Sequence, residues 1–287
     1  ILMSILKKLE IGHNFSSSEK AIAQYILTNT EEVLNLSTVK LAQKTYTSPA
    51  TIVRLCQKLN YKGYNDFKID LAANLQYVLS HHENINANFP FDKKTNTSHI
   101  SNTIARLYKE SIDETIHIID QEQLRKSILL LDKADVIDIY GVSGPLRMAS
   151  DFQYKMFRIG KNVNIAPMVN EQLFQAALST PKHCAILVSY SGETEEVINA
   201  AKILKNQKTP MIGITSLGEN QLSQYCEYVL NLDSREQIYN KISTLGSTIS
   251  IHLIFDILYT GIFSRHYEES FQTKYQTDIL IDHRLKK

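Results

Sequence analysis

Short runs of β-branched and other apolar residues alternate with helical patterns in the chain from residue 121 onward. The runs lie at residues 136–140, 163–168, 185–190, 211–215 and 228–232. Apolar residues at helical spacing occupy the stretches between and after them, at about 144–159, 170–179, 193–207, 219–226 and 237–263. Strands that alternate with helices form parallel sheets with helices on both faces. The pattern therefore predicts a doubly wound α/β domain with a five-stranded parallel sheet.

The loop after the most apolar of these runs combines hydroxyl side chains with a glycine. It reads Ser189-Tyr190-Ser191-Gly192-Glu193-Thr194 and stands directly before a predicted helix. Ligands of doubly wound sheets bind at the carboxyl ends of the strands, and the free N–H groups of a helix N-terminus attract anions. The loop therefore has the donors that hold a phosphate, and its glycine lets the backbone approach closely. A polar turn that only caps the helix is the alternative, which spacing alone leaves open.

The first 79 residues show helical spacing of apolar side chains and no alternation typical of strands. Two short helices are predicted on either side of a tight turn at residues 44–47. Ser37 is placed to cap the first helix, and Ser48 with Pro49 to begin the second. Helices joined in this way form a helix-turn-helix, whose second helix enters the major groove of DNA. An ordinary helical hairpin is the alternative.

The second of these helices has a face predicted to be buried and a face predicted to bind DNA. The buried face carries Ile52, Leu55, Cys56 and Leu59. The candidate DNA-binding residues are Ser48, Ala50, Thr51, Arg54 and Lys58. Small residues at the start of the helix permit close approach to DNA, and Arg54 can reach a guanine edge or a phosphate. Residues 1–79 hold nine Lys and Arg against six Asp and Glu, a mild basic excess that is compatible with phosphate contact.

This region resembles the N-terminal domain of the RpiR family of bacterial regulators. The resemblance covers about residues 4–79 and rests on S-P-A-T-x-x-R, from Ser48, followed by K-L-x-Y-x-G-Y-x-x-F-K, which ends at Lys68. At the turn, where such proteins usually carry Gly and Val, this chain has Tyr46 and Thr47. If Tyr46 takes the left-handed conformation there, the cost is on the order of 1 kcal/mol.

The form S-x-S-G-x-T, in turn, resembles the sugar isomerase (SIS) domain, a phosphosugar-binding α/β module that usually forms the second half of RpiR-type regulators. This resemblance covers about residues 121–265 and implies that Ser189, Ser191 and Thr194 hold the phosphate. The first loop of such domains usually reads G-x-G-x-S, whereas residues 141–145 here read Gly-Val-Ser-Gly-Pro. Proline thus stands at the usual serine position. Either Ser143 supplies the hydroxyl after a small shift, or the sugar is held differently or weakly.

These features predict a DNA-binding transcriptional regulator of carbohydrate metabolism whose operator affinity is modulated by a sugar phosphate. The candidate sugar-phosphate site comprises Ser143, Ser189, Tyr190, Ser191, Gly192, Glu193 and Thr194. The alternative is a sugar-phosphate isomerase or lyase with an accessory helical domain. Such an enzyme needs an acid and a base near the phosphate, and the chain offers Glu193, Glu236 and His252 in no recognisable arrangement. We therefore expect no catalytic residue, no cofactor and no metal site.

The 287 residues are enough for two ordinary domains with a connection between them. We expect a helix-turn-helix domain at 1–79, a linker at 80–97, a connecting helix at 98–120, a SIS-like domain at 121–270 and a C-terminal tail at 271–287. The linker and the connecting helix are the predicted path from effector to DNA. The apolar faces of 98–119 and 237–263 exceed what one small sheet needs, which predicts a homodimer or a dimer of dimers on a two-fold operator.

The remaining features concern location and redox state. The three cysteines, Cys56, Cys184 and Cys226, are far apart and are expected to be reduced, mostly buried thiols. The first ten residues have no charged segment ahead of an apolar core, so no secretory signal is expected. The most apolar run, 249–263, is interrupted by His252 and Asp256 and falls short of the roughly 18–20 residues of a membrane span. A cytoplasmic protein without membrane contact is predicted.

Overall fold

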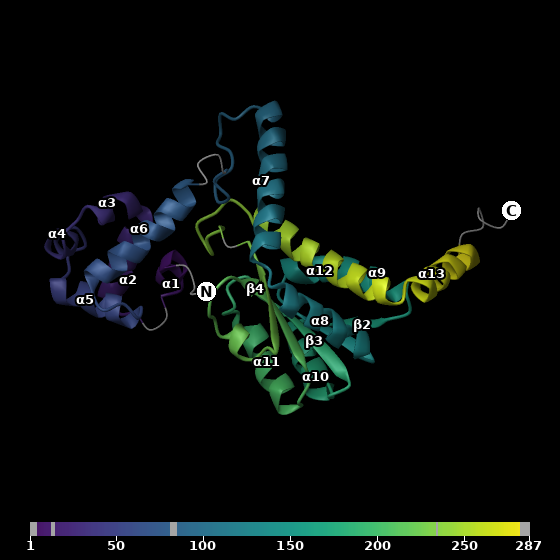
Figure 1. Ribbon diagram of the computed structural model, residues 1–287. Coiled ribbons are helices and arrows are strands. Elements are labelled where there is room, and N and C mark those ends of the chain that lie inside the picture. The colour runs from purple at the N-terminus through teal and green to yellow at the C-terminus, as the bar shows by residue number, and fades with distance from the viewer. Residues whose placement is uncertain (1–4, 13–14, 81–84, 234, 282–287) are drawn as a thin grey trace. The chain divides into compact units, whose positions relative to one another are not determined.

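The computed structural model describes residues 5–12, 15–80, 85–233 and 235–281, and Figure 1 traces its elements. The chain divides into two compact units. Unit 1 consists of Ile1–Phe89 with Gln237–Ile242, and unit 2 consists of Pro90–Glu236 with Ser243–Lys287. The described part of unit 1 contains helices and no strand, whereas unit 2 contains the sheet.

Six helices surround one apolar core in the described residues of unit 1. They are α1 (Ile5–Ile11), α2 (Ser17–Thr28), α3 (Thr30–Leu34), α4 (Thr38–Lys44), α5 (Pro49–Lys58) and α6 (Tyr64–Ser80). Each contributes at least one side chain to the core, including Ile22, Leu41, Ile52 and Phe67, which are at most 1% exposed. The four residues predicted to be buried on α5 are all buried, which confirms the predicted helical phase.

Side-chain caps fix where these helices begin. Helix α2 starts with a capping box, in which Ser16 Oγ accepts from the Glu19 N–H and the Glu19 carboxylate accepts from the Ser16 N–H at 2.7 Å. Ser37 caps α4 and Ser48 caps α5, with Pro49 in the first turn of α5, so the predicted helix starts are confirmed. The tight turn of the helix-turn-helix lies between the end of α4 at Lys44 and Ser48, which closes the turn by capping α5.

Unit 2 is built on a five-stranded parallel sheet, as the alternating pattern predicts. The strands are β1 (Val136–Tyr140), β2 (Asn162–Ile165), β3 (His183–Val188), β4 (Met211–Ser216) and β5 (Tyr228–Leu232), in the order β2-β1-β3-β4-β5. The helices of unit 2 are α7 (Thr97–Ile118), α8 (Gln121–Lys133), α9 (Gly144–Phe157), α10 (Val169–Leu178), α11 (Glu195–Asn206), α12 (Leu245–Arg265) and α13 (Tyr267–Ile281).

Helices cover both faces of this sheet (Figure 1). One apolar cluster joins Ile137 and Ile139 of β1 to residues of α8, α9 and α12. A second cluster joins Tyr140 and Leu187 to residues of α10 and α11 on the opposite face. Ile139 and Tyr140, two successive residues of β1, thus enter different clusters, as expected for a sheet that is covered on both faces.

Helix α12 is the one helix among the described residues that is long and apolar enough to qualify as a membrane span by length and composition. Its most apolar window is 44% buried inside the protein. The buried side chains include Ile251, Ile254, Phe255 and Leu258. The helix packs against α7, α8, α9 and β5, so a place in the core of unit 2 accounts for its composition.

Two predicted helices are shorter than the sequence pattern indicates. The long helix expected from residue 237 begins only at Leu245, where the Glu236 carboxylate accepts hydrogen bonds from the N–H groups of Gly246 and Ser247. The helix expected at 219–226 is reduced to a 3-10 turn at Leu222–Gln224. At the first place a carboxylate about ten residues away binds the late helix start, and at the second the Asn220 side chain accepts from the Ser223 N–H at 3.0 Å, a local bond that competes with a longer helix.

The predicted C-terminal tail from residue 271 is corrected by the structure. Its first part is helical and belongs to α13. Arg158 of α9 forms an ion pair with Asp278, and Ser270 is 5% exposed. The rings of Phe271 and Tyr275 stack with their centroids 6.1 Å apart. These contacts stabilise a helix in a stretch whose sequence is largely polar. The last predicted tail residues, 282–287, lie outside the described residues.

The cysteines have the burial expected of structural thiols. Cys56 and Cys184 are buried, and Cys226 is intermediate. Burial raises the pKa of Cys56 to about 12, and burial together with the charge of Glu227 raises that of Cys226 to about 12. Burial also raises the pKa of Cys184. Thiols in this state are poor nucleophiles at neutral pH.

Candidate functional site

The strand order reverses between β1 and β3, which lie side by side with Tyr140 opposite Leu187. The loop of residues 141–145 leaves β1 and the loop of residues 189–194 leaves β3, so both open at the same edge of the sheet. The two loops start close together: a Cβ on Gly141 would stand 3.4 Å from the carbonyl oxygen of Val188, the last residue of β3. This reversal point is where doubly wound sheets bind their ligands.

Internal hydrogen bonds shape the loop of residues 189–194. Ser189 Oγ lies 2.7 Å from Thr194 Oγ1 and accepts from the Gly192 N–H at 3.1 Å. Ser191 Oγ accepts from the Glu193 N–H at 3.1 Å. Thr194 is the N-cap residue of the twelve-residue helix α11 and makes no side-chain capping bond. Three hydroxyls and an uncapped helix N-terminus therefore stand on one turn, the combination that binds a phosphate.

Gly192 is required by the geometry of this loop. Its φ is +70°, and a Cβ at this position would lie 2.1 Å from the side-chain amide of Asn220. Asn220 is 4% exposed and donates to Thr215 Oγ1 at 3.2 Å, so it is held in place against the loop. The sequence analysis missed Asn220, because nothing local marks a loop asparagine as the support of a turn some thirty residues earlier.

The Glu193 side chain is directed toward the loop that follows β4. Its carboxylate accepts from the backbone N–H of Gln221 at 2.8 Å and from Gln221 Nε2 at 2.6 Å. The side chain predicted as a pocket residue thus bridges two loops. Both oxygens of its carboxylate are therefore occupied by Gln221, next to the hydroxyls of the loop of residues 189–194.

Ser143 occupies a strained position in the first loop. Its φ and ψ are 57° and −107°, a region that side-chain-bearing residues rarely adopt, and it is exposed. It precedes α9, where it makes no capping bond. Gln172 clamps the start of the loop, because its amide donates to the Gly141 carbonyl at 2.9 Å and accepts from the Gly141 N–H at 3.1 Å. The loop therefore presents the Ser143 hydroxyl from a backbone that would suit glycine.

A cavity of about 420 Å³ opens beside this first loop. Ser143, Arg147 and Ser150 contribute polar groups to its lining, and Gln172 and Ile165 also line it. Arg147 is an exposed cation two residues after Pro145, and the sequence analysis did not single it out. Its place on the first turn of α9 became evident only with the cavity.

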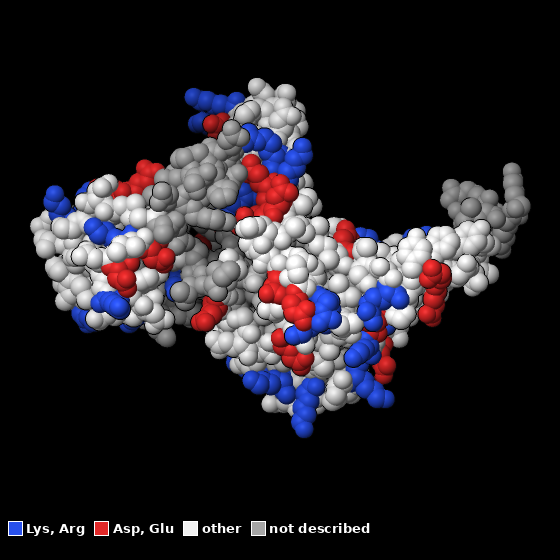
Figure 2. Space-filling model, viewed as in Figure 1, with Lys and Arg blue, Asp and Glu red and all other residues white. Residues whose placement is uncertain are grey.

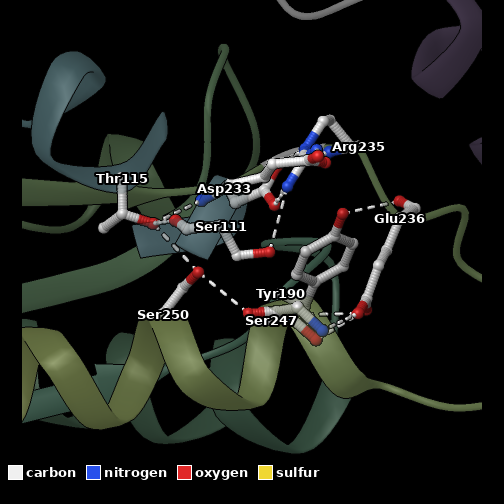
Figure 3. Close-up of polar contacts among 10 residues, drawn as sticks. Ser111, Thr115, Tyr190, Asp233, Arg235, Glu236, Ser247 and Ser250 are labelled. Atoms are coloured by element: carbon white, nitrogen blue, oxygen red, sulfur yellow. Dashed lines mark hydrogen bonds and ion pairs between the residues drawn. The ribbon is translucent and has the colours of Figure 1, made fainter. Parts of the chain in front are cut away.

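The side chain of Tyr190 connects the loop of residues 189–194 to the segment that follows β5 (Figure 3). The Tyr190 hydroxyl donates to the Glu236 carbonyl oxygen at 2.5 Å. The Glu236 carboxylate, 2% exposed, accepts from the N–H of Ser247 at 3.0 Å and from its hydroxyl at 2.7 Å. The Glu236 carboxylate therefore binds the N-terminus of α12, while its backbone carbonyl binds the Tyr190 hydroxyl.

Asp233, Arg235 and Glu236 form what we call the post-β5 cluster. The Arg235 guanidinium is bound to both oxygens of Asp233 and to Ser111 Oγ at 3.1 Å (Figure 3). It is also bound to Glu110 Oε2 at 3.0 Å. Burial alone would lower the pKa of Arg235, but the hydrogen bonds and charges of Asp233 and Glu110 raise it. Glu110 and Ser111 belong to α7, so the cluster joins that helix to the segment that holds Tyr190.

His252 lies on α12, in a group with Asp151 and Asp256. Its Nε2 is 3.5 Å from Asp151 and 3.8 Å from Asp256. The three ligand atoms lie within 4.8 Å of one another, as a metal site requires. Lys155 Nζ stands 2.6 Å from Asp151 and 2.5 Å from Asp256, so a cation of the protein itself already neutralises these carboxylates.

The exposed face of α5 carries most of the predicted DNA-binding residues. Ser48, Ala50 and Arg54 are exposed, and Thr51 is half-buried. The Ser48 hydroxyl is occupied by the helix cap, where it accepts from the Thr51 N–H at 3.2 Å. Arg54 places an exposed, long cationic side chain on this face.

Lys58, the fifth of these residues, is also exposed, and it forms an ion pair within unit 1. Its ammonium lies 2.7 Å from Glu19 Oε2, and the Glu19 side chain is 5% exposed. Burial raises the pKa of Glu19, but hydrogen bonds from Lys58 and Ser16 outweigh that effect and leave the pKa below its usual value. Lys58 thus neutralises a buried acid within unit 1. The contact spans 39 residues, which no local pattern reveals.

The charges on the visible face of unit 1 are mixed. Figure 2 shows Lys and Arg scattered among Asp and Glu over this unit. The mild basic excess of the sequence is therefore spread out, and specific side chains must carry DNA contact. One of the most exposed side chains of the turn is Tyr46, which has a φ of 51° and is 97% exposed, so the left-handed conformation considered from the sequence is present.

Comparison with known proteins identifies both halves of the chain. The family model of the SIS domain matches residues 130–259, and that of the helix-turn-helix domain of the rpiR family matches residues 3–77. An HTH-type transcriptional regulator of Haemophilus influenzae is 27% identical and covers 99% of this chain and 98% of its own length. One from Caldanaerobacter subterraneus is 28% identical and covers 91% of this chain and 90% of its own length.

Solved structures agree with these matches. The Vibrio vulnificus NanR protein complexed with ManNAc-6P has a TM-score of 0.62 and 26% sequence identity, covering 97% of this chain and 99% of its own. The sugar isomerase domain of an RpiR transcription factor from Sphaerobacter thermophilus has a TM-score of 0.56 and 13% identity, covering 62% of this chain and 97% of its own, which shows a shared fold. The chain therefore combines a helix-turn-helix domain of the rpiR family with a SIS domain.

Proposed function

We propose that this protein is a DNA-binding transcriptional regulator of carbohydrate metabolism, whose affinity for operator DNA changes when a sugar phosphate binds the loop of residues 189–194. The observation that carries the proposal is the turn on which the hydroxyls of Ser189, Ser191 and Thr194 meet the uncapped N-terminus of α11. That turn lies at the reversal point of the sheet, in a chain that also has an rpiR-type DNA-binding domain.

The effector class is narrowed by the NanR likeness. NanR was solved with ManNAc-6P and aligns with nearly the whole chain, so N-acetylated amino-sugar 6-phosphates are the first candidates. Thermal unfolding of the full chain should be measured with ManNAc-6P, its gluco isomer, glucose 6-phosphate and inorganic phosphate. A ligand at 100 times its Kd stabilises the folded state by about 2.7 kcal/mol. Failure of every sugar phosphate to raise Tm would remove the sensor half of the proposal.

Binding without turnover is favoured over the isomerase or lyase alternative. Of the three acid–base candidates, Glu193 is engaged by Gln221 and Glu236 is buried at the start of α12. His252 is grouped with Asp151 and Asp256. None of these placements supports a base directed at a sugar on the phosphate turn. Product formation from the stabilising sugar phosphate, measured by NMR, would restore the enzyme alternative.

The DNA half of the proposal assigns α5 as the reading helix on double-stranded operator DNA. Arg54 is an exposed cation of this helix, and Ser48, Ala50 and Thr51 form the small-residue start that permits close approach. Replacement of Arg54 by alanine should abolish specific binding while leaving Tm unchanged, since the side chain is exposed. Retained binding would refute the assignment of α5 as the reading helix.

A homodimer in the cytoplasm completes the proposal. Unit 2 exposes large apolar side chains on α9, α13, α10 and the residue before α10, namely Tyr154, Phe157, Met168, Phe174, Leu178, Phe271 and Tyr275. Such exposure, on both sides of the sheet, is typical of association surfaces, and a two-fold dimer would present two reading helices to a palindromic operator. Light scattering of the purified chain should give twice or four times the 32.7 kDa of one chain.

A further inference from the structure

Four non-glycine residues in the described part of the chain have a positive φ: Tyr46, Asn60, Ser143 and Lys208. Tyr46, Asn60 and Lys208 each follow directly after the C-cap residue of a helix, which is α4, α5 and α11 respectively. At this position glycine carries no steric penalty, and asparagine is the usual second choice. Tyrosine has neither advantage, so the residue after α4 needs another explanation.

The left-handed conformation of Tyr46 is imposed by the way α4 ends. The Thr47 N–H donates to the Ala42 carbonyl at 2.9 Å, and the Tyr46 N–H donates to the Gln43 carbonyl at 3.3 Å. This pair of bonds is a Schellman motif, which requires a left-handed residue between the helix and the following turn. The motif thus sets the backbone of Tyr46, and its side chain is held there at a steric cost.

Packing does not offset this cost. Tyr46 is 97% exposed, so its ring buries almost no area within the protein. The turn around it is nevertheless well fixed, because Thr45 is 8% exposed and its hydroxyl lies 2.8 Å from that of Thr47. A large, outward-directed side chain on a rigid turn is a feature of recognition surfaces, where rigid aromatic groups bind at low entropic cost.

The position of Tyr46 indicates what it contacts. It lies two residues before Ser48, the N-cap of α5, and the N-terminal end of the reading helix is the end that faces DNA. Tyrosine hydroxyls are among the side-chain groups that donate to phosphate oxygens of the DNA backbone. We propose that the Tyr46 hydroxyl binds a backbone phosphate of the DNA and positions α5 in the groove. This inference rests on the DNA-binding half of the proposed function.

Three variants of the full chain test this role: Tyr46→Phe, Tyr46→Gly and, as a matched control, Lys208→Gly. Affinity is measured by fluorescence anisotropy at low salt with a labelled duplex of about 30 base pairs of mixed sequence, because phosphate contacts do not depend on sequence. Loss of a hydrogen bond to a charged group predicts roughly tenfold weaker binding by Tyr46→Phe and by Tyr46→Gly. The salt dependence of binding should stay unchanged, since tyrosine carries no charge.

Opposite effects on stability and affinity distinguish this role from a structural one. Tyr46→Gly and Lys208→Gly both relieve a left-handed backbone, so both should raise Tm, whereas only Tyr46→Gly should weaken DNA binding. Wild-type affinity of Tyr46→Phe and Tyr46→Gly, alongside weakened binding by Arg54→Ala, would overturn the role of Tyr46 alone. Failure of the wild-type chain to bind DNA would overturn it together with the proposed function.

Discussion

The Tyr190 hydroxyl donates a hydrogen bond to the Glu236 carbonyl oxygen at 2.5 Å, and this bond joins the proposed phosphate loop to the post-β5 cluster. In the same cluster, Arg235 is bound to Glu110 and Ser111 of α7. Helix α7 follows the segment that leads from unit 1, so a change at the loop has a continuous polar route to the helix nearest the linker in sequence. A ligand shifts an equilibrium only through contacts that differ between two states, and these bonds are candidates for such contacts.

Replacement of Glu110 by glutamine should weaken this coupling. The change removes the charge from an ion pair whose side chains are 20% and 19% exposed, yet it leaves the phosphate loop untouched. We expect the effector's influence on DNA affinity to fall severalfold from its wild-type value, which for allosteric proteins is typically about 5- to 150-fold. Effector affinity of the DNA-free protein, measured by calorimetry, should stay within about twofold, because allosteric coupling and local binding are separate free energies.

The matched control for this prediction is Glu122→Gln on α8. Glu122 also pairs with an arginine, Arg125, but both side chains are more than half exposed. The control should behave as wild type in both measurements. If Glu110→Gln retains full coupling, the post-β5 cluster is a structural support and not a route of communication.

Replacement of Ser143 by glycine should stabilise the protein and weaken effector binding. Glycine suits the φ of 57° and ψ of −107°, so Tm should rise slightly. Loss of a hydroxyl that binds a phosphate or sugar oxygen should raise the effector Kd roughly tenfold. Lys208→Gly serves as control, since it relieves a similar φ away from the cavity. An unchanged Kd would mean that the first loop holds the sugar through other groups.

Replacement of Gly192 by alanine should disrupt the phosphate turn. The new methyl group would overlap the side chain of Asn220, which is buried and bonded to Thr215. Together with the left-handed φ, this overlap predicts a loss of about 1–3 kcal/mol in unfolding free energy and no measurable effector binding. In contrast, Gly63→Ala should change neither, because no heavy atom lies within 4 Å of its added Cβ. Wild-type stability of Gly192→Ala would contradict the described loop geometry.

Replacement of Lys58 by methionine should destabilise unit 1 without lowering DNA affinity. The Glu19 carboxylate would lose its cation while staying buried, which costs about 1–3 kcal/mol at neutral pH. The folded-state pKa of Glu19 lies below its usual 4.5, so its stabilisation is present above that value and is lost as pH falls through the folded pKa. The difference in unfolding free energy between wild type and variant should therefore shrink below about pH 4.

Urea unfolding across this pH range, and anisotropy with folded protein, measure the two effects. Lys20→Met, which removes an exposed lysine from α2, is the control and should have little effect on stability. A large loss of DNA affinity by folded Lys58→Met would restore Lys58 as a phosphate contact.

Local rules explain what could be predicted from the sequence. Ser37 and Ser48 are helix caps because a hydroxyl before an apolar helical run satisfies free N–H groups. The five parallel strands follow from short apolar runs between helices, and the boundaries agree within two or three residues. The hydroxyl-rich turn at Ser189 is likewise local, since strand, glycine and helix start are adjacent in the chain.

Contacts between distant residues explain what could not be predicted. The ion pair of Lys58 with Glu19, a residue 39 positions earlier, gives this predicted DNA-binding residue a partner within unit 1. Glu236 delays the start of α12 through bonds to residues ten and eleven positions later. Arg235 acquires its partners from α7, more than a hundred residues earlier, so no spacing rule connects them. These long-range polar contacts depend on the folded sheet, which brings their elements together.

The most direct test of the account is the DNA affinity of the full chain with and without sugar phosphate. A duplex selected from a random library by the protein is titrated by anisotropy, in the absence and presence of the sugar phosphate that gives the largest rise in Tm. We predict at least a fivefold change in Kd for the wild type, and no change for the double variant Ser191→Ala, Thr194→Ala at the same effector concentration. Equal affinities of the wild type under both conditions, with effector binding confirmed by calorimetry, would contradict the central claim.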